Sequence, residues 1–168
     1  GKGFCAGGDI SGMERRMNAP AGEVGFNGWH RQQRVHHTQM LLHTMPKPVI
    51  AAVNGAASGL GADTALACDF ILASEWASFT WSYIHRGIVP DGGGMYFLPR
   101  RVGLARAKEL IYSGRRVSAD EALKLGIADR LARACLEDRR VMRARVRIEK
   151  PGALSAVIAP GCEIVLAR

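Results

Sequence analysis

The chain has 168 residues with a net charge of +8, and 48% of the residues are hydrophobic. Such a chain is long enough for one domain with a buried core. Because no apolar run could span a bilayer and no signal-peptide pattern is visible, we expect a cytoplasmic protein without membrane segments.

The basic residues gather at 100–101 and 139–147. A solvated helix face explains them best, and a site for a phosphorylated small molecule is an alternative. Aromatic residues are not interleaved with the basic ones, so no nucleic-acid binding is expected.

The first 45 residues are predicted to hold a glycine turn, a loop and a helix. The turn is F-C-A-G-G-D at residues 4–9. Residues 11–28 are rich in Gly, Asn and Pro and are predicted to form a loop. Apolar residues near helical spacing predict an amphipathic helix over 29–45, stopped by the prolines that follow. Because a glycine turn needs a preceding strand to hold it, we expect further sequence before Gly1.

The remaining chain alternates apolar runs with helical patterns. Strands are predicted at 49–53, 69–73 and 127–131, with a shorter strand-like piece before the glycine turn that ends at 94. Helices are predicted at 61–67, 104–113 and from 119 to the residue before Gly126, the last opened by the capping-box spacing of Ser118 and Glu121. This alternation favours an α/β fold with largely parallel strands.

A second glycine-rich segment, N-G-A-A-S-G-L-G-A-D, follows the predicted strand at 49–53. Small residues let a backbone approach a ligand closely and leave amide N–H groups pointing outward. Two such N–H groups converging on one point would form an oxyanion hole. A dinucleotide-binding turn is a weaker alternative, because the segment lacks G-x-G-x-x-G and a later acid for a ribose.

Five motifs occur together: F-C-A-G-G-D, K-P-V-I-A-A-V-N-G with S-G-L-G-A-D, A-L-A-C-D, G-I-V-P-D-G-G-G, and S-G-R-R-V-S-A-D-E-A-L-K-L-G-I-A-D. In this order they resemble the crotonase superfamily, the enoyl-CoA hydratase/isomerase family. The resemblance implies an α/β, crotonase-like spiral of ββα units that lacks its N-terminal part here. Residues 1–131 would be the core, and 132–168 a C-terminal helical region that builds a homotrimer or a dimer of trimers. It also implies an acyl-CoA substrate and no cofactor beyond the CoA moiety.

Carried over position by position, the resemblance assigns the oxyanion donors to the backbone N–H groups of Ala6 and Leu60. Each such donor is typically worth about 2.7–4 kcal/mol in the transition state. Contacts to the substrate or its CoA moiety are expected from flanking residues, namely Cys5, Gly7, Asp9, Ile10, Gly59, Gly61 and Tyr83. Cys5 is interpreted as a small packing residue rather than a nucleophile. No metal site is expected, because neither the cysteines nor the histidines show metal-ligand spacing.

The acid–base positions depart from those of a typical hydratase of the family, which has two glutamates. The first aligns with Asp63, a shorter carboxylate, and the second with Tyr83, a poor base at neutral pH. Asp91, in V-P-D-G-G-G, stands where some isomerases of the family place a catalytic aspartate. One carboxylate suffices to shift a double bond, so we predict an isomerase with Asp91 as principal base and Asp63 as helper.

Simpler interpretations of these residues stay open. Asp before Gly is a common turn former, and Asp63 would also suit the first turn of a helix. Enoyl-CoA hydratase and a non-catalytic crotonase-fold binding protein are the alternative functions.

Overall fold

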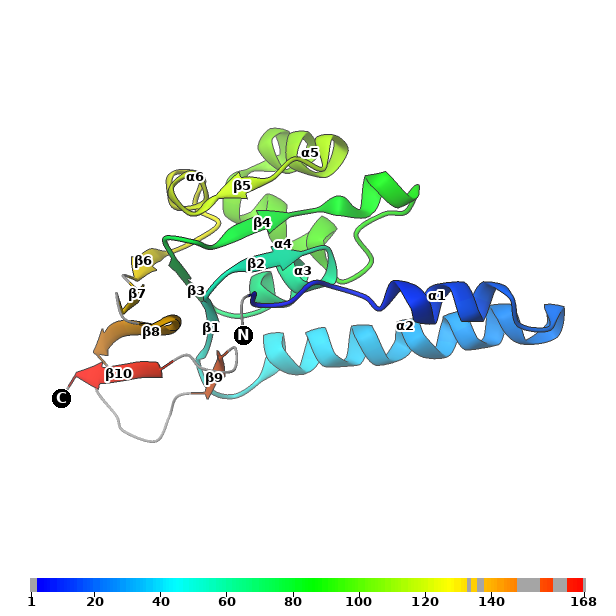
Figure 1. Cartoon of the computed structure of the whole chain (residues 1–168), viewed down its shortest axis with the longest axis horizontal. Coiled ribbons are helices and arrows are strands. Elements are labelled where there is room, and N and C mark those ends of the chain that lie inside the picture. Colours follow the sequence, from blue (N-terminus) through cyan, green and yellow to red (C-terminus); the bar gives the residue numbers. More distant parts are fainter. Residues whose placement is uncertain (1–2, 133, 136–137, 148–154, 159–162, 168) are drawn as a thin grey trace.

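The fold is built from short strands and helices that alternate along the chain (Figure 1). The computed structural model describes residues 3–132, 134–135, 138–147, 155–158 and 163–167. The helices are α1 (Ile10–Met17), α2 (Ala21–Thr44), α3 (Leu60–Leu66), the 3₁₀ helix η1 (Ser82–Arg86), α4 (Gly94–Val102), α5 (Leu104–Ser113) and α6 (Ala119–Leu125). The strands are β1 (Val49–Val53), β2 (Ala56–Ser58), β3 (Phe70–Ser74), β4 (Ser78–Thr80), β5 (Val117–Ser118), β6 (Arg130–Ala132), β7 (Ala134–Cys135), β8 (Asp138–Arg147), β9 (Ser155–Ile158) and β10 (Glu163–Ala167).

Two successive ββα units form the centre of the molecule. The first is β1–β2–α3 and the second is β3–β4–α4. Strand β1 pairs in parallel with β3, and β2 pairs in parallel with β4. The second unit therefore repeats the arrangement of the first and lies directly beside it. The larger sheet has the order β6-β3-β1-β9, and the pairs within it are parallel. The expected spiral of ββα units with largely parallel strands is therefore confirmed.

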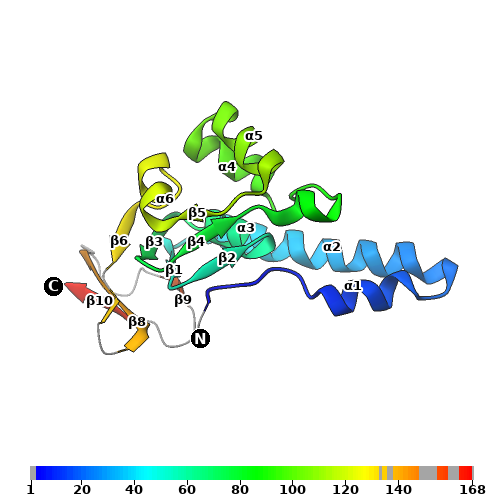
Figure 2. The same cartoon turned by 45° about the horizontal axis from the view of Figure 1, so that its top comes forward.

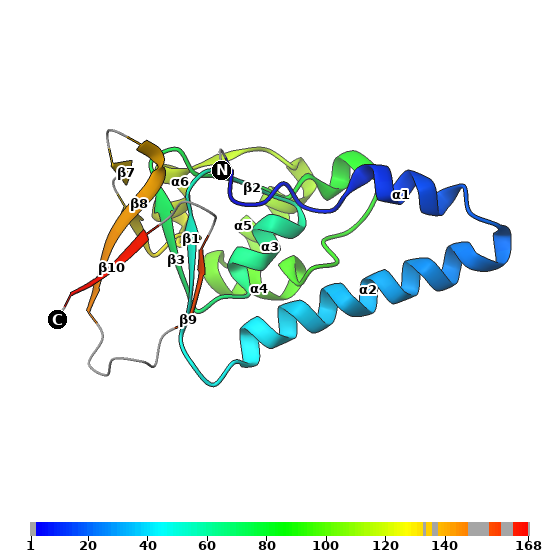
Figure 3. The ribbon, with the colours of Figure 1, turned by 60° about the horizontal axis from the view of Figure 1, so that its bottom comes forward.

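The core lies between this sheet and the helices that follow it. All five residues of β1 are buried, as expected of an apolar strand covered on both faces. The largest fully buried apolar side chains come from β3, β4, the helices α4 and α5, and the connections between them: Ile71, Phe79, Trp81, Leu98, Leu110 and Ile127. Helices α4 and α5 lie on one side of the strands (Figure 2), and β8 and β10 lie on the other (Figure 3).

Helices α1 and α2 run side by side as an arm that extends away from this body (Figures 1 and 3). The predicted loop at 11–28 is therefore wrong, because most of these residues are helical. Asp9 caps α1 by accepting a hydrogen bond from the Ser11 N–H at 3.1 Å, and only the short break around Pro20 separates the two helices. The predicted helix at 29–45 is confirmed, but α2 begins eight residues earlier, at Ala21. None of the helices in the described part of the chain is long and apolar enough to cross a membrane.

The C-terminal region also differs from the expected helices. Its described residues form strands β7 to β10, and β9 pairs with β1 in the larger sheet. The reason lies in the sequence: basic and apolar residues alternate from Arg143 to Arg147, a period of two that suits a strand. The predicted helical region also includes residues that lie outside the described part of the chain, namely 133, 136–137, 148–154, 159–162 and 168. The trimer-forming role of 132–168 stays a prediction.

Candidate active site

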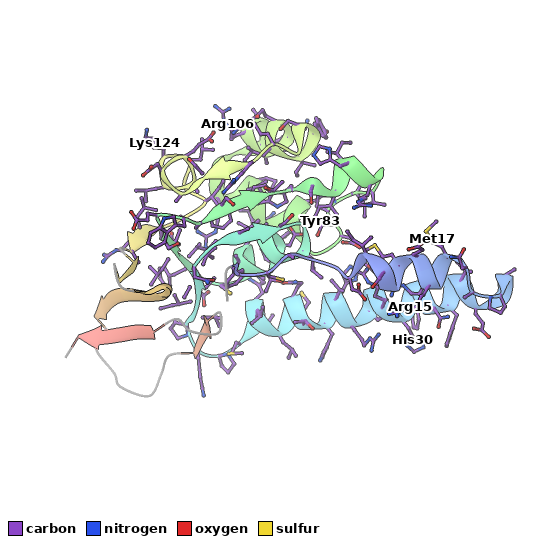
Figure 4. The ribbon with its side chains drawn as sticks, in the orientation of Figure 1. Arg15, Met17, His30, Tyr83, Arg106 and Lys124 are labelled. Atoms are coloured by element: carbon purple, nitrogen blue, oxygen red, sulfur yellow. The ribbon has the colours of Figure 1, made fainter. Side chains whose placement is uncertain are left out.

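A cavity of about 770 Å³ lies where the arm meets the body. Both glycine-rich segments, α1, α2, η1 and the turn before α4 contribute to its wall. Seven of the residues predicted for the site line it: Ala6, Gly7, Ile10, Gly59, Leu60, Tyr83 and Asp91. Figure 4 shows Tyr83 in the body of the molecule, near the start of the arm that carries Arg15 and Met17.

The first glycine turn lies directly on the second. The N–H of Cys5 donates to the carbonyl of Ala56 at 3.1 Å, and the N–H of Ser58 donates to the carbonyl of Cys5 at 2.9 Å. Gly7 has a φ of +94°, and a Cβ there would lie 2.7 Å from the Ser58 oxygen and 3.5 Å from the Leu60 nitrogen. Only glycine fits this conformation and this close approach.

The two residues predicted to supply the oxyanion donors both border the cavity. Ala6 and Leu60 line its wall. Within the described part of the chain, neither backbone N–H donates to a protein acceptor. Leu60 is the first residue of α3, and the first N–H groups of a helix have no partner within it. Two neighbouring turns in the cavity wall therefore each carry a residue whose backbone N–H has no acceptor in the described part of the chain.

Tyr83 reaches the same wall because β2 and β4 are in register. Ser58 is opposite Thr80, and the Gly59 N–H donates to the Thr80 carbonyl at 2.8 Å. The residues that follow the two strands are therefore neighbours. The ring of Tyr83 lies 3.9 Å from the position that a Cβ on Gly59 would take.

Asp63 lies behind Tyr83 and does not line the cavity. Its side chain is fully buried, and both oxygens accept hydrogen bonds, Oδ1 from Trp81 Nε1 at 3.0 Å and Oδ2 from the Tyr83 hydroxyl at 2.6 Å. Burial raises the pKa of Asp63 to about 6, against the opposing effect of these hydrogen bonds. The turn before α4 covers the carboxylate, and a Cβ on Gly92 would lie 2.8 Å from Oδ2.

Burial and the neighbouring carboxylate of Asp63 also affect Tyr83. Together they hold the pKa of the Tyr83 phenol well above its usual range. The phenol therefore stays protonated, and its hydrogen is directed to Asp63.

Asp91 is the predicted carboxylate that the structure brings to the cavity. Its side chain is 30% exposed, and its Oδ2 lies 3.9 Å from Nη1 of Arg31, on α2. The Asp91 carbonyl accepts a hydrogen bond from Gln32 Nε2 at 3.2 Å. Asp91, Ala6 and Leu60 thus line one cavity.

Three predicted contact residues do not line the cavity: Cys5, Asp9 and Gly61. Asp9 caps α1, and its hydrogen bonds with Ser11, the side-chain bond above all, hold the pKa of its carboxyl below the usual value. Gly61 lets α3 approach the first turn, because a Cβ there would collide with the Cys5 carbonyl. The backbone of Cys5 forms a parallel bridge with Ala57, and the packing role of its side chain stays a prediction.

Residues of the arm line the cavity without having been predicted to do so. They are Met13, Glu14, Met17, Asn18 and Arg31. The spacing of Ile10, Met13 and Met17 is that of one helix face, and this signal was available in the sequence. Nothing in the sequence alone placed α2 against Asp91.

Among the described residues, no cluster of His, Cys, Asp or Glu is arranged to hold a metal ion.

Comparisons with known proteins identify the family of the chain. Residues 1–159 match the enoyl-CoA hydratase/isomerase family. The chain is 36% identical to the enoyl-CoA isomerase/hydratase fer4 of Mycosarcoma maydis over 171 aligned positions (98% of this chain, 60% of fer4). It is 41% identical to the crotonyl-CoA hydratase of Syntrophomonas wolfei over 130 (77% of this chain, 47% of that protein).

The solved structures give the same picture. The crystal structure of enoyl-CoA hydratase from Bacillus anthracis is 40% identical, with a TM-score of 0.70 over 79% of this chain and 49% of that one. The chain spans about half the length of the curated relatives it matches, between 48% and 60% for the first three. By its sequence match and its fold, the chain belongs to the enoyl-CoA hydratase/isomerase family.

Proposed function

We propose that this protein acts on an acyl-CoA thioester and shifts a double bond along the acyl chain by proton transfer. One observation supports the proposal: Asp91, Ala6 and Leu60 all line the same cavity. A carboxylate and two fixed donors are what a proton transfer next to a thioester needs.

The reaction divides between these groups. The thioester oxygen would accept hydrogen bonds from the N–H groups of Ala6 and Leu60. Asp91 would take a proton from the carbon next to the thioester of a 3-enoyl-CoA, which leaves a dienolate whose negative charge rests on that oxygen. The protonated Asp91 would then return the proton two carbons further along the chain, giving 2-enoyl-CoA. The proton that Asp91 removes is the one it returns, so the reaction needs no other acid.

Asp63 has an indirect part in this proposal. Both of its oxygens accept hydrogen bonds and it does not line the cavity, so it is not placed to touch a substrate. Its hydrogen bond to the Tyr83 hydroxyl fixes the ring of Tyr83 in the cavity wall beside Gly59. We therefore assign Asp63 the role of holding Tyr83, and Tyr83 the role of shaping the site near the thioester.

Hydration of a 2-enoyl-CoA is the second candidate. It is favoured by Glu14 of α1, which supplies a second carboxylate to the cavity wall, since water addition in this family uses two carboxylates. Relatives are named for both reactions.

A homotrimer or a dimer of trimers remains a further prediction, to be checked by analytical ultracentrifugation.

The test offers a 3-enoyl-CoA and a 2-enoyl-CoA separately to the full-length natural protein and analyses the products by mass. We expect 2-enoyl-CoA without a gain in mass, and a loss of turnover of at least about a hundredfold in Asp91→Asn. Asp120→Asn, an exposed aspartate on α6, is the matched control and should turn over normally. Addition of one water to the 2-enoyl substrate would instead establish the hydratase. No product from either would refute both.

A further inference from the structure

Arg31 of α2 places its guanidinium in the cavity wall beside the proposed base. Its Nη1 lies 3.9 Å from Asp91 Oδ2, and its side chain is only 21% exposed. In the described part of the chain this ion pair is the polar contact that the guanidinium makes. At this separation the pair is electrostatic rather than a hydrogen bond, so the lone pairs of the carboxylate stay available for a proton.

The same guanidinium also rests on the first glycine turn. A Cβ on Gly8 would lie 2.8 Å from Arg31 Nη2, and the methyl group of Met13 lies close by as well. The absence of a side chain at Gly8 therefore leaves the space that the guanidinium fills. Arg31 thus stands between the turn that carries the Ala6 N–H and the carboxylate of Asp91.

Helix α2 also holds the backbone of Asp91. Gln32 Nε2 donates to the Asp91 carbonyl at 3.2 Å, and His36 Nε2 lies 3.0 Å from the same oxygen. His36 Nε2 also lies 3.0 Å from Gln32 Nε2, so it donates to the carbonyl in one tautomer and accepts from Gln32 in the other. In both cases Gln32 fixes the carbonyl, and Arg31 is left to fix the side chain.

We propose that Arg31 is a positioning residue that aims the Asp91 carboxylate into the cavity and sets its place relative to the first glycine turn. This inference rests on the proposed role of Asp91 as base. A fixed positive charge on one side of a short carboxylate favours one rotamer over the others. Misplacing a reacting group by about 1 Å costs on the order of a hundredfold in rate, so losing this contact should slow turnover.

The experiment compares Arg31→Gln with Arg34→Gln in the full-length natural protein, with the substrate that the wild type converts. Arg34 is exposed on the same helix, so the control removes the same charge. For Arg31→Gln we expect kcat to fall by about 10- to 100-fold while KM changes by less than about threefold. Arg31→Lys, which keeps the charge, should recover part of kcat, as should added guanidinium ion with Arg31→Ala. Thermal unfolding checks that each variant is folded.

Three results would overturn the inference. One is a kcat for Arg31→Gln equal to that of Arg34→Gln. Another is a raised KM with unchanged kcat, which would make Arg31 a substrate-binding residue. The third is a loss of activity that neither Arg31→Lys nor guanidinium ion relieves. Asp91→Asn is measured alongside: if it retains full turnover, the proposed function fails, whereas a slow Asp91→Asn beside a fast Arg31→Gln defeats only the role of Arg31.

Discussion

The buried carboxyl of Asp63 makes the stability of the fold depend on pH in a definite direction. Burial raises its pKa from 3.8 to about 6. The folded state therefore binds the proton more tightly than the unfolded state does. The corresponding stability is fully present below pH 3.8 and is lost as the pH rises through about 6. Since the side chain is fully buried, this shift corresponds to about 3 kcal/mol.

Replacing Asp63 with Asn removes the titration but keeps a side chain of the same shape. The amide can accept only one of the two hydrogen bonds from Trp81 and Tyr83, so Asp63→Asn should be less stable than the wild type at pH 4. The wild type alone loses stability as the carboxyl ionises. The stability difference should therefore shift in favour of the variant by about 2 kcal/mol between pH 4 and pH 7.5, less than the full 3 kcal/mol because the unfolded-state carboxyl is already partly ionised at pH 4.

Urea unfolding followed by tryptophan fluorescence at several pH values measures this difference. Comparing the two proteins at each pH cancels the titration of the other groups that they share. Asp120→Asn, at an exposed position, should track the wild type across the range. A gap between Asp63→Asn and the wild type that stays constant with pH would show that Asp63 ionises normally, and the argument from burial would be refuted.

Two further predictions concern glycine and an ion-pair network. Gly25→Ala, whose Cβ meets open space on α2, should raise the free energy of unfolding by about 0.5–1 kcal/mol. Gly61→Ala should lower it by about 1–3 kcal/mol, because its Cβ collides with Cys5; equal urea midpoints for the two would contradict this. Hydrogen bonds from Arg115 hold the pKa values of Glu109 and Glu121 below 4.5. Arg115→Gln should therefore cost about 1 kcal/mol at pH 7, a loss that shrinks as the pH falls below 4.5; calorimetry showing a pH-independent loss would speak against it.

The central units of the fold were predictable because their signals are local. A continuous apolar run gave β1 with its bounds, and α5 occupies the predicted 104–113. Ser118 caps α6 as expected and accepts a hydrogen bond from the Glu121 N–H at 3.3 Å, but the Glu121 side chain is bound by Arg115, so only this half of the predicted capping box is seen. These local predictions are correct because the tertiary structure buries the same apolar residues and uses the same helix cap that the sequence pattern indicates.

The arm was missed because glycine signals a turn only when the backbone needs it. Gly22 and Gly25 lie within α2, where a Cβ on either would meet open space, so neither position needs the conformational freedom of glycine. The position of Asp63 was not predictable either. The sequence placed it in a helix after the second glycine segment, but only the tertiary fold sets the Gly92–Gly94 turn over its carboxylate. The pairing of Arg31 with Asp91 joins residues sixty apart and has no local signal.

The in-register pairing of β2 with β4 has a consequence for how this chemistry can change. The third residue after β4 is presented beside the turn after β2, whatever its side chain is. The proposed N–H donors belong to the backbone, so they do not depend on which side chain stands at position 83. Under the proposed function, a new acid or base at position 83 would therefore lie next to the bound thioester without any new scaffold. In contrast, one residue inserted between Ser78 and Phe79 would turn Phe79 out of the core and displace Tyr83 relative to the turn after β2. A substitution just after these strands thus changes the chemistry of the site while the fold is kept. An insertion within the strands disrupts the fold and the site together.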